Sequence, residues 1–278
     1  MSVVYLGTSD FAAAVLRALA QTPHRPSLVV TRPDAPKGRG RKLAAPPAAE
    51  AARELGIAVD QPQDVNAQEA RARIAADDPD AVVVCAFGAL LKEPLLSEHE
   101  LLNVHPSLLP RWRGAAPIER AILAGDAQTG VSIMRVTAGL DSGPVCLQQR
   151  EPIHPDDTFG TLSARLEELG ARLLVRALEE RPPFADQDDS QVTYAEKLGP
   201  ADRDLDLADP VGADRTVRAL TPHIGARLKL ADGSYLGVHE ARLRDGVLEL
   251  VTVQPPGGRP MAYADYVRGH GEPVPAAG

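Results

Sequence analysis

The sequence is poor in cysteine and contains no long apolar run. Only two cysteines occur among 278 residues, too few for a disulfide framework, so Cys85 and Cys146 are expected to be reduced thiols. No pair of cysteines or histidines has the spacing of zinc ligands, and we predict no metal site. No stretch approaches the ~18 continuous apolar residues of a membrane span, and the first residues lack the basic region of a signal peptide. These absences predict a cytoplasmic protein with no membrane partner.

The overall charge is acidic. The formal net charge of −8 argues against wholesale coating by nucleic acid, although a local basic patch can still bind it. An apolar content of 44% and a charged content of 24% are ordinary for a globular protein with a sizeable core. The length suits one large domain, or one larger and one smaller domain.

The first part of the chain has the pattern of a strand, a helix and a second strand. Val3–Gly7 and Leu28–Thr31 are apolar runs, and apolar residues recur at helical spacing between Phe11 and Ala20. This order predicts a βαβ unit in a parallel sheet. The first turn has no G-x-G-x-x-G and no acid follows the second strand, so dinucleotide binding is not expected.

Two later turns are candidates for lining one pocket. The apolar run 80–86 is typical of a central parallel strand and ends at Phe87-Gly88-Ala89-Leu90, while another apolar strand leads into Asn103. Ligands of open α/β sheets bind beyond the carboxyl ends of the strands. Both turns are therefore expected at the same pocket.

Asn103 and His105 are the first candidates for chemistry. Being two apart on a strand, they project to the same face, where an amide and an imidazole can stabilise an oxyanion and move a proton. The strand 131–136 leads to Asp141, which lies in a glycine-flanked turn and can reach a histidine if the strands are neighbours. The alternative is that Asn103 caps a turn and His105 is a structural histidine.

A basic segment interrupts this acidic chain. Residues 32–43 contain five basic residues and one acid, with two prolines and two glycines, which predicts an exposed, adaptable loop. Such a local reversal of charge suits a phosphate backbone, although a solvated loop without a partner has the same composition.

The composition changes after residue 181. A polar run at 186–191 predicts a linker, and beyond Pro200 the pattern is of short strands at 226–230, 236–243 and 247–253. Asp-Gly pairs at 232–233 and 245–246 are strong hairpin signals. A small β-barrel fits this pattern.

Long contiguous motifs resemble those of a known family. Asn-x-His followed by SLLPRWRGAAPIER and then GVSIMRVTAGLDSG closely resembles the 10-formyltetrahydrofolate-dependent formyltransferases, and within them the members acting on methionyl-initiator tRNA. The resemblance runs from Val3 to about Leu198 and returns near Gln254. It implies an α/β fold: a Rossmann-like formyltransferase domain with a mostly parallel sheet, followed by a small OB-like β-barrel domain.

The resemblance also implies roles for individual residues. It makes Asn103, His105 and Asp141 catalytic. It implies 10-formyltetrahydrofolate as co-substrate, with contacts from Phe87, Gly88, Leu90, Ser107, Leu108, Leu109 and Pro110. Members acting on tRNA carry a basic insertion at the position of the basic segment, so the expected tRNA contacts are Lys37, Arg39, Arg41 and Lys42. Formylation of methionyl-initiator tRNA would serve translation initiation, and a monomer is expected.

The expected modules are a catalytic domain at 1–183, a linker at 184–200 and a barrel at 201–278. This last segment is shorter than the usual barrel of the family, which keeps a second substrate open, a nucleotide-linked amino sugar at the same Asn-His-Asp site. A hydrolase that releases formate from the folate would share the three residues but need no basic loop. A non-catalytic folate- or nucleotide-binding module is the alternative from another class.

Overall fold

The computed structural model describes residues 1–37 and 42–276. Within it the chain forms two compact units, and each unit is assembled from separate segments. The first consists of Met1–Arg113, Gly130–Glu151 and Ala164–Tyr194, and the second of Gly114–Thr129, Pro152–Ser163 and Ala195–Gly278. Both units are therefore discontinuous in sequence. The modules at 1–183, 184–200 and 201–278 stay a prediction.

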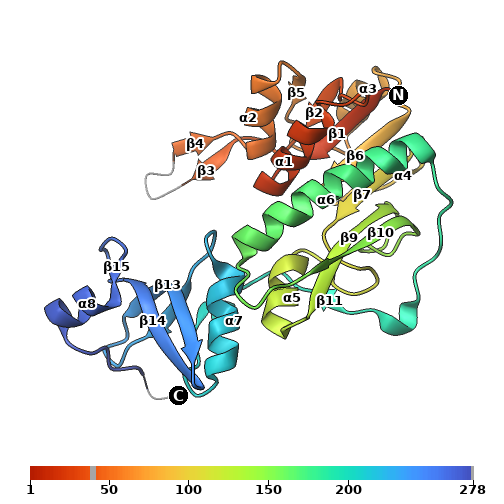
Figure 1. The fold of residues 1–278 in the computed structure, drawn as a ribbon. Helices are drawn as coiled ribbons and strands as arrows, with labels where there is room; N and C mark the ends of the chain where they lie inside the picture. The colour runs from red at the N-terminus through yellow and green to blue at the C-terminus, as the bar shows by residue number, and fades with distance from the viewer. Residues whose placement is uncertain (38–41, 277–278) are drawn as a thin grey trace. The chain divides into compact units, whose positions relative to one another are not determined.

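The first unit is built on a seven-stranded sheet with the order β10-β9-β7-β6-β1-β2-β5 (Figure 1). Neighbouring strands from β5 through β7 are parallel, and β9 runs antiparallel to β7. The mostly parallel, Rossmann-like sheet is thereby confirmed. The strands are β1 (Val3–Gly7), β2 (Leu28–Val30), β5 (Ala58–Asp60), β6 (Ala81–Cys85), β7 (Leu101–His105), β9 (Gln128–Arg135) and β10 (Val145–Pro152).

Alternation along the strands buries both faces of this sheet. Val4 and Leu6 pack in an apolar cluster with Ile74 and Leu95, which belong to α3 (Gln68–Ala75) and α4 (Leu95–Glu98). Tyr5 points the other way and donates to the carbonyl of Ala12 at 2.7 Å. The opposite face is therefore covered by α1 (Asp10–Leu19), which packs on α2 (Pro47–Glu54).

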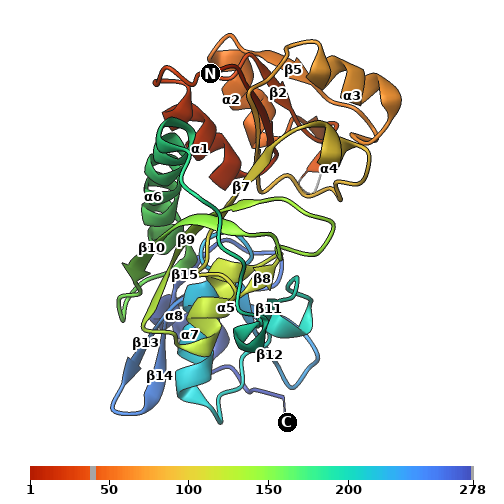
Figure 2. The same cartoon turned by 90° about the vertical axis from the view of Figure 1, so that its right-hand side faces the viewer.

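A glycine lets the longest helix, α6 (Phe159–Glu180), approach this second face closely. A Cβ on Gly170 would lie 2.9 Å from Cγ1 of Val104 in β7 and 3.9 Å from the ring of Phe11 in α1. Any larger side chain would push α6 off the strand. Figure 2 accordingly shows α6 beside α1, with α3 on the other side of the sheet.

The basic segment forms a short hairpin of β3 (Ala35–Lys37) and β4 (Lys42–Ala44), where the sequence predicted only a loop. Side-chain bonds hold its base. Gln61 donates to the carbonyl of Arg32 at 2.9 Å and to Asp34 at 2.8 Å, and Arg32 donates to the carbonyl of Gly88 at 2.6 Å.

In the second unit the C-terminal strands form an antiparallel sheet of four strands. They are β12 (Ala226–Lys229), β13 (Tyr235–Arg244), β14 (Val247–Gln254) and β15 (Met261–Ala262). The expected strands are confirmed, and they form an antiparallel sheet. The resemblance implied a small OB-like β-barrel, and the described residues show no closed barrel. The apolar side of the sheet is buried against Val217 and Leu220 of one helix and Tyr266 of another.

Those two helices, α7 (Pro210–Leu220) and α8 (Tyr263–His270), were not predicted from the sequence. The start of α7 nevertheless carries a recognisable signal. Asp209 caps it by accepting from the Gly212 N–H at 3.0 Å, and Pro210 occupies the first helical position. The remaining elements are β8 (Arg113–Gly114), α5 (Pro117–Ala124), β11 (Tyr194–Ala195) and short 3₁₀ turns at Asp189–Gln191 and Ala201–Arg203.

Candidate active site

The candidate site is built on β7, which lies between β6 and β9. Asn103 is in register with Val84 on one side and Met134 on the other, and His105 is opposite Ser132. The strand that precedes Asp141 is therefore a direct neighbour of the strand carrying Asn103 and His105. From the sequence, we expected Asp141 to reach His105 only if these two strands were neighbours, and they are.

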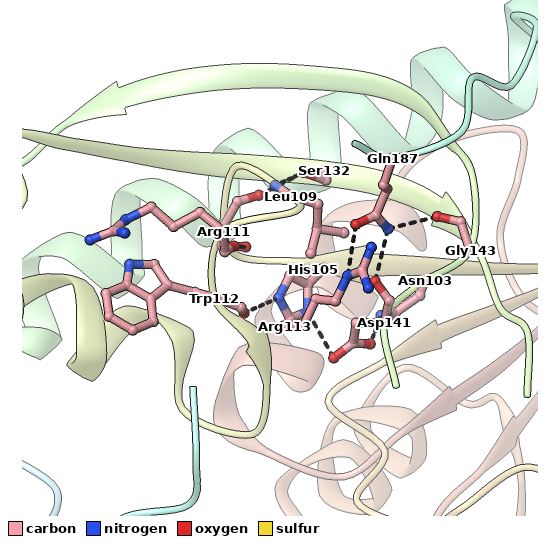
Figure 3. Close-up of polar contacts among 11 residues, drawn as sticks. Asn103, His105, Leu109, Arg111, Trp112, Arg113, Ser132, Asp141, Gly143 and Gln187 are labelled. Atoms are coloured by element: carbon pink, nitrogen blue, oxygen red, sulfur yellow. Dashed lines mark hydrogen bonds and ion pairs between the residues drawn. The ribbon is translucent and has the colours of Figure 1, made fainter. Parts of the chain in front are cut away.

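The structure brings the three predicted catalytic side chains together (Figure 3). The Nδ2 of Asn103 lies 3.5 Å from Oδ1 of Asp141, and Nδ1 of His105 lies 3.7 Å from Oδ2 of the same carboxylate. His105 is 4% exposed, while the Asp141 side chain is 19% exposed. An amide donor, an imidazole and a carboxylate thus converge on one small region, as general acid–base chemistry at a carbonyl requires.

The other nitrogen of His105 has a partner that determines the tautomer. Nε2 lies 2.9 Å from the backbone carbonyl oxygen of Trp112, and a carbonyl can only accept. Nε2 therefore carries the hydrogen in the neutral ring, which leaves the lone pair on Nδ1, on the side of Asp141.

The turn after β7 is held by a buried serine on β9. Ser132 donates to the carbonyl of Ser107 at 2.6 Å, and its oxygen accepts from Leu109 N–H at 3.1 Å and from the Gln148 amide at 2.9 Å. Gln148 also donates to the carbonyl of Leu109 at 2.9 Å. Ser132 thus has all its hydrogen-bonding capacity in use. The turn it holds carries four predicted folate contacts: Ser107, Leu108, Leu109 and Pro110.

The turn after β6 carries the other predicted folate contacts. Thr8 donates to the carbonyl of Phe87 at 2.7 Å, and Gly88 adopts φ +73°, a left-handed conformation in which glycine carries no Cβ penalty. Phe87 is buried, whereas Leu90 is 67% exposed. Because β6 and β7 are parallel neighbours, their following turns begin at the same edge of the sheet. They offer both apolar surface and fixed backbone groups to a flat ligand.

Sequence reasoning missed a set of residues that hydrogen-bond to the segment after the folate turn. Trp112 N–H donates to Oγ1 of Thr193 at 2.9 Å, and Arg113 N–H donates to the carbonyl of Thr193 at 2.9 Å. Arg113, 5% exposed, donates to Gln187 at 3.0 Å and to Asp189 at 2.8 Å. Gln187 and Thr193 lie in the segment predicted as a linker, whose polar composition carries no sign of these contacts.

The predicted tRNA contacts are only partly described. Lys37 ends β3 and Lys42, which is exposed, begins β4, whereas Arg39 and Arg41 lie outside the described residues. Within 1–37 and 42–276, no cluster of three or more His, Cys, Asp or Glu residues could hold a metal ion. In the same part of the chain no helix is both long and apolar enough to span a membrane.

Neither cysteine is activated. Burial raises the pKa of the Cys85 thiol to about 12 and also raises the pKa of Cys146. A thiol is nucleophilic as its thiolate. Both residues are free thiols, and a raised pKa lowers the fraction of each that is thiolate.

Comparisons with known proteins identify the family of the chain. Residues 1–178 match the family described as formyl transferase, and the chain belongs to that family. Its full-length relatives are methionyl-tRNA formyltransferases. That of Halorhodospira halophila is 42% identical and that of Methylococcus capsulatus 40% identical, over 98% and 97% of both chains respectively.

A solved structure of similar fold is HypX from Aquifex aeolicus in complex with tetrahydrofolic acid. It has a TM-score of 0.65 and 16% sequence identity, and the match covers 96% of this chain and 47% of that one. This likeness supports the architecture of the fold.

Proposed function

We propose that this chain transfers the formyl group of 10-formyltetrahydrofolate to the α-amino group of methionyl-initiator tRNA, in the cytoplasm and as a monomer. The observation that carries the proposal is the convergence of Asn103, His105 and Asp141 in a chain whose full-length relatives are named for this activity.

The turns after β6 and β7 suit a folate. Leu90 offers exposed apolar surface, while the backbone of both turns is held by Thr8, Arg32 and Ser132. When bound, the folate supplies an activated formyl group.

Each of the three side chains then has one task. The Asn103 amide donates to the oxygen on which negative charge develops, a role worth about 10²- to 10³-fold in rate. His105 takes up at Nδ1 the proton that the attacking amine must lose, and returns it to the departing nitrogen. This help is worth about 10²- to 10⁴-fold. Asp141, 3.7 Å from Nδ1, stabilises the ring while it is charged.

The basic hairpin is proposed to bind the tRNA phosphates through Lys37, Arg39, Arg41 and Lys42. It favours tRNA over the alternative acceptor, a nucleotide-linked amino sugar, because a sugar nucleotide has few phosphates for so many cations. Phosphate binding of this kind weakens as salt increases.

A formyl-transfer assay with 10-formyltetrahydrofolate tests this function, with methionyl-initiator tRNA and a UDP-linked amino sugar as rival acceptors. The triple variant Arg39→Ala, Arg41→Ala, Lys42→Ala should raise KM for the tRNA and reduce its dependence on salt. The matched control is Arg172→Ala, Arg176→Ala, Arg181→Ala, which removes the same charge from three exposed positions elsewhere in the chain. Transfer to the sugar alone would retain the catalytic assignment and overturn the substrate.

A further inference from the structure

The turn that carries Asp141 has a backbone conformation that must be held. Asp141 adopts φ +44°, in the left-handed region that residues other than glycine seldom adopt and that aspartate tolerates better than most. The turn also packs tightly on β9, since a Cβ on Gly143 would lie 1.9 Å from the carbonyl oxygen of Arg135. The direction of the Asp141 carboxylate therefore depends on how the backbone of this turn is held.

Gln187 supplies that restraint (Figure 3). Its Nε2 donates to the carbonyl of Asp141 at 2.8 Å and to the carbonyl of Gly143 at 2.7 Å. Both hydrogens of the amide are therefore donated to the backbone of the turn that carries Asp141. Within 185–190 only Gln187 is partly buried, while its neighbours are exposed, so this side chain alone turns inward.

Arg113 determines which way the Gln187 amide points. Its Nε donates to Oε1 of Gln187 at 3.0 Å, and a guanidinium has no acceptor, so only the oxygen of the amide can face it. The NH₂ group must then face the two carbonyls. Because Arg113 is 5% exposed and also pairs with Asp189 at 2.8 Å, the guanidinium itself has little freedom to move.

We propose that Gln187 is a positioning residue for the formyl transfer, which it serves by holding the backbone of Asp141 so that the carboxylate faces Nδ1 of His105. The kinetic effects expected of this residue rest on the proposed function. Its hydrogen bonds to the Asp141 turn do not depend on that function. The segment predicted as a linker is, on this proposal, part of the catalytic apparatus.

Gln187→Met tests the proposal, because it keeps the length of the side chain and its neutrality but removes both donors. We expect kcat to fall by about tenfold to 100-fold, as misplacement of a catalytic group does, with KM for both substrates within about twofold. Gln187→Glu is the second variant. It keeps an acceptor for Arg113 and lacks the donors, so it should show the same loss, and it replaces the Met variant if that protein does not fold. Gln191→Met is the matched control, since its amide donates to Asp188 on the exposed part of the segment.

A double variant separates positioning from general damage. In the Asp141→Asn background, Gln187→Met should change kcat by less than about twofold, because residues that act through one another are not additive. A loss of the same size in both backgrounds would overturn the proposal, as would normal kcat in Gln187→Met.

The ¹⁵N resonances of the His105 ring give a readout that needs no turnover, with the signal assigned by its absence in His105→Gln. Gln187→Met should shift these resonances in the direction that Asp141→Asn does. Unchanged resonances in Gln187→Met, beside shifted ones in Asp141→Asn, would overturn the proposal. If the wild-type chain transfers no formyl group but the resonances move as expected, the proposed function fails and the positioning role stands.

Discussion

His105 donates its Nε2 hydrogen to the backbone carbonyl of Trp112 at 2.9 Å, seven residues further along the chain. Because the acceptor is a peptide oxygen, the tautomer depends on the path of the chain through Ser107–Pro110 and on no side chain at position 112. That path is in turn held by Ser132 on the neighbouring strand. Nε2 of His105, the predicted folate turn and β9 are thus linked by hydrogen bonds.

Asn103→Ala removes the proposed oxyanion donor. We expect kcat to fall by about 10²- to 10³-fold, with KM for the folate little changed, because the bond forms mainly as negative charge develops. Steady-state kinetics measures this, and circular dichroism checks that the fold is retained. Near-normal turnover in a folded Asn103→Ala protein would remove Asn103 from the mechanism.

Ser132→Ala should loosen the turn that carries Ser107 and Leu109. It strips three buried partners of the Ser132 hydroxyl, at a cost of about 1–3 kcal/mol in unfolding free energy. We also expect KM for the folate to rise. Urea unfolding and kinetics measure the two effects, with Ser97→Ala as control because Ser97 is exposed and bonds only to its own turn at Pro94. If stability falls but KM for the folate does not change, the turn does not contribute to folate binding.

Gly130→Ala should be destabilising although alanine is small. A Cβ at this position in β9 would lie 2.1 Å from the carbonyl oxygen of Gln149 and 2.5 Å from Cδ2 of Leu108. Overpacking of this kind costs about 1–3 kcal/mol, and here it also displaces the predicted folate turn. The matched control is Gly269→Ala in α8, where nothing lies within 4 Å of the added carbon. Equal melting temperatures for the two variants would contradict the close approach.

Asp202→Asn should reveal a pH-dependent contribution in the second unit. The Gly199 N–H at 2.7 Å, and then Arg120 at 2.9 Å, hold the pKa of Asp202 below its usual range. A carboxylate with a lowered folded pKa contributes stability above its unfolded pKa of about 3.9, and this is lost as pH falls through the folded value.

The variant should therefore be less stable at pH 7, by about 1 kcal/mol or less because the pair is partly exposed to solvent. The difference from wild type should narrow as pH falls below the unfolded pKa of about 3.9. Urea unfolding over this range measures it, and a difference that does not depend on pH would show that the charge of Asp202 is not responsible.

Local patterns in the sequence were sufficient for most of the fold. Apolar runs located β1, β2, β6 and β7, and Asp-Gly turns located the C-terminal hairpins, because side-chain periodicity and turn chemistry are properties of neighbouring residues. The same local patterns did not decide whether the C-terminal strands close into the expected small barrel. Whether a sheet closes depends on what covers its apolar face, and α7 and α8 cover it here.

The amino-acid sequence by itself determined that Asn103 and His105 share one face of a strand, because a spacing of two residues decides it. It also determined, through its motifs, the family to which the chain belongs. Only the tertiary structure decided how the site is held. The backbone of Asp141 accepts from Gln187, which lies 46 residues further along the chain in a polar run, and Arg113 donates to the same Gln187. His105 bonds to the backbone carbonyl of Trp112 in a turn. Hydrogen bonds between distant segments leave no periodic trace in a sequence, since they depend on which strands become neighbours and where the chain returns.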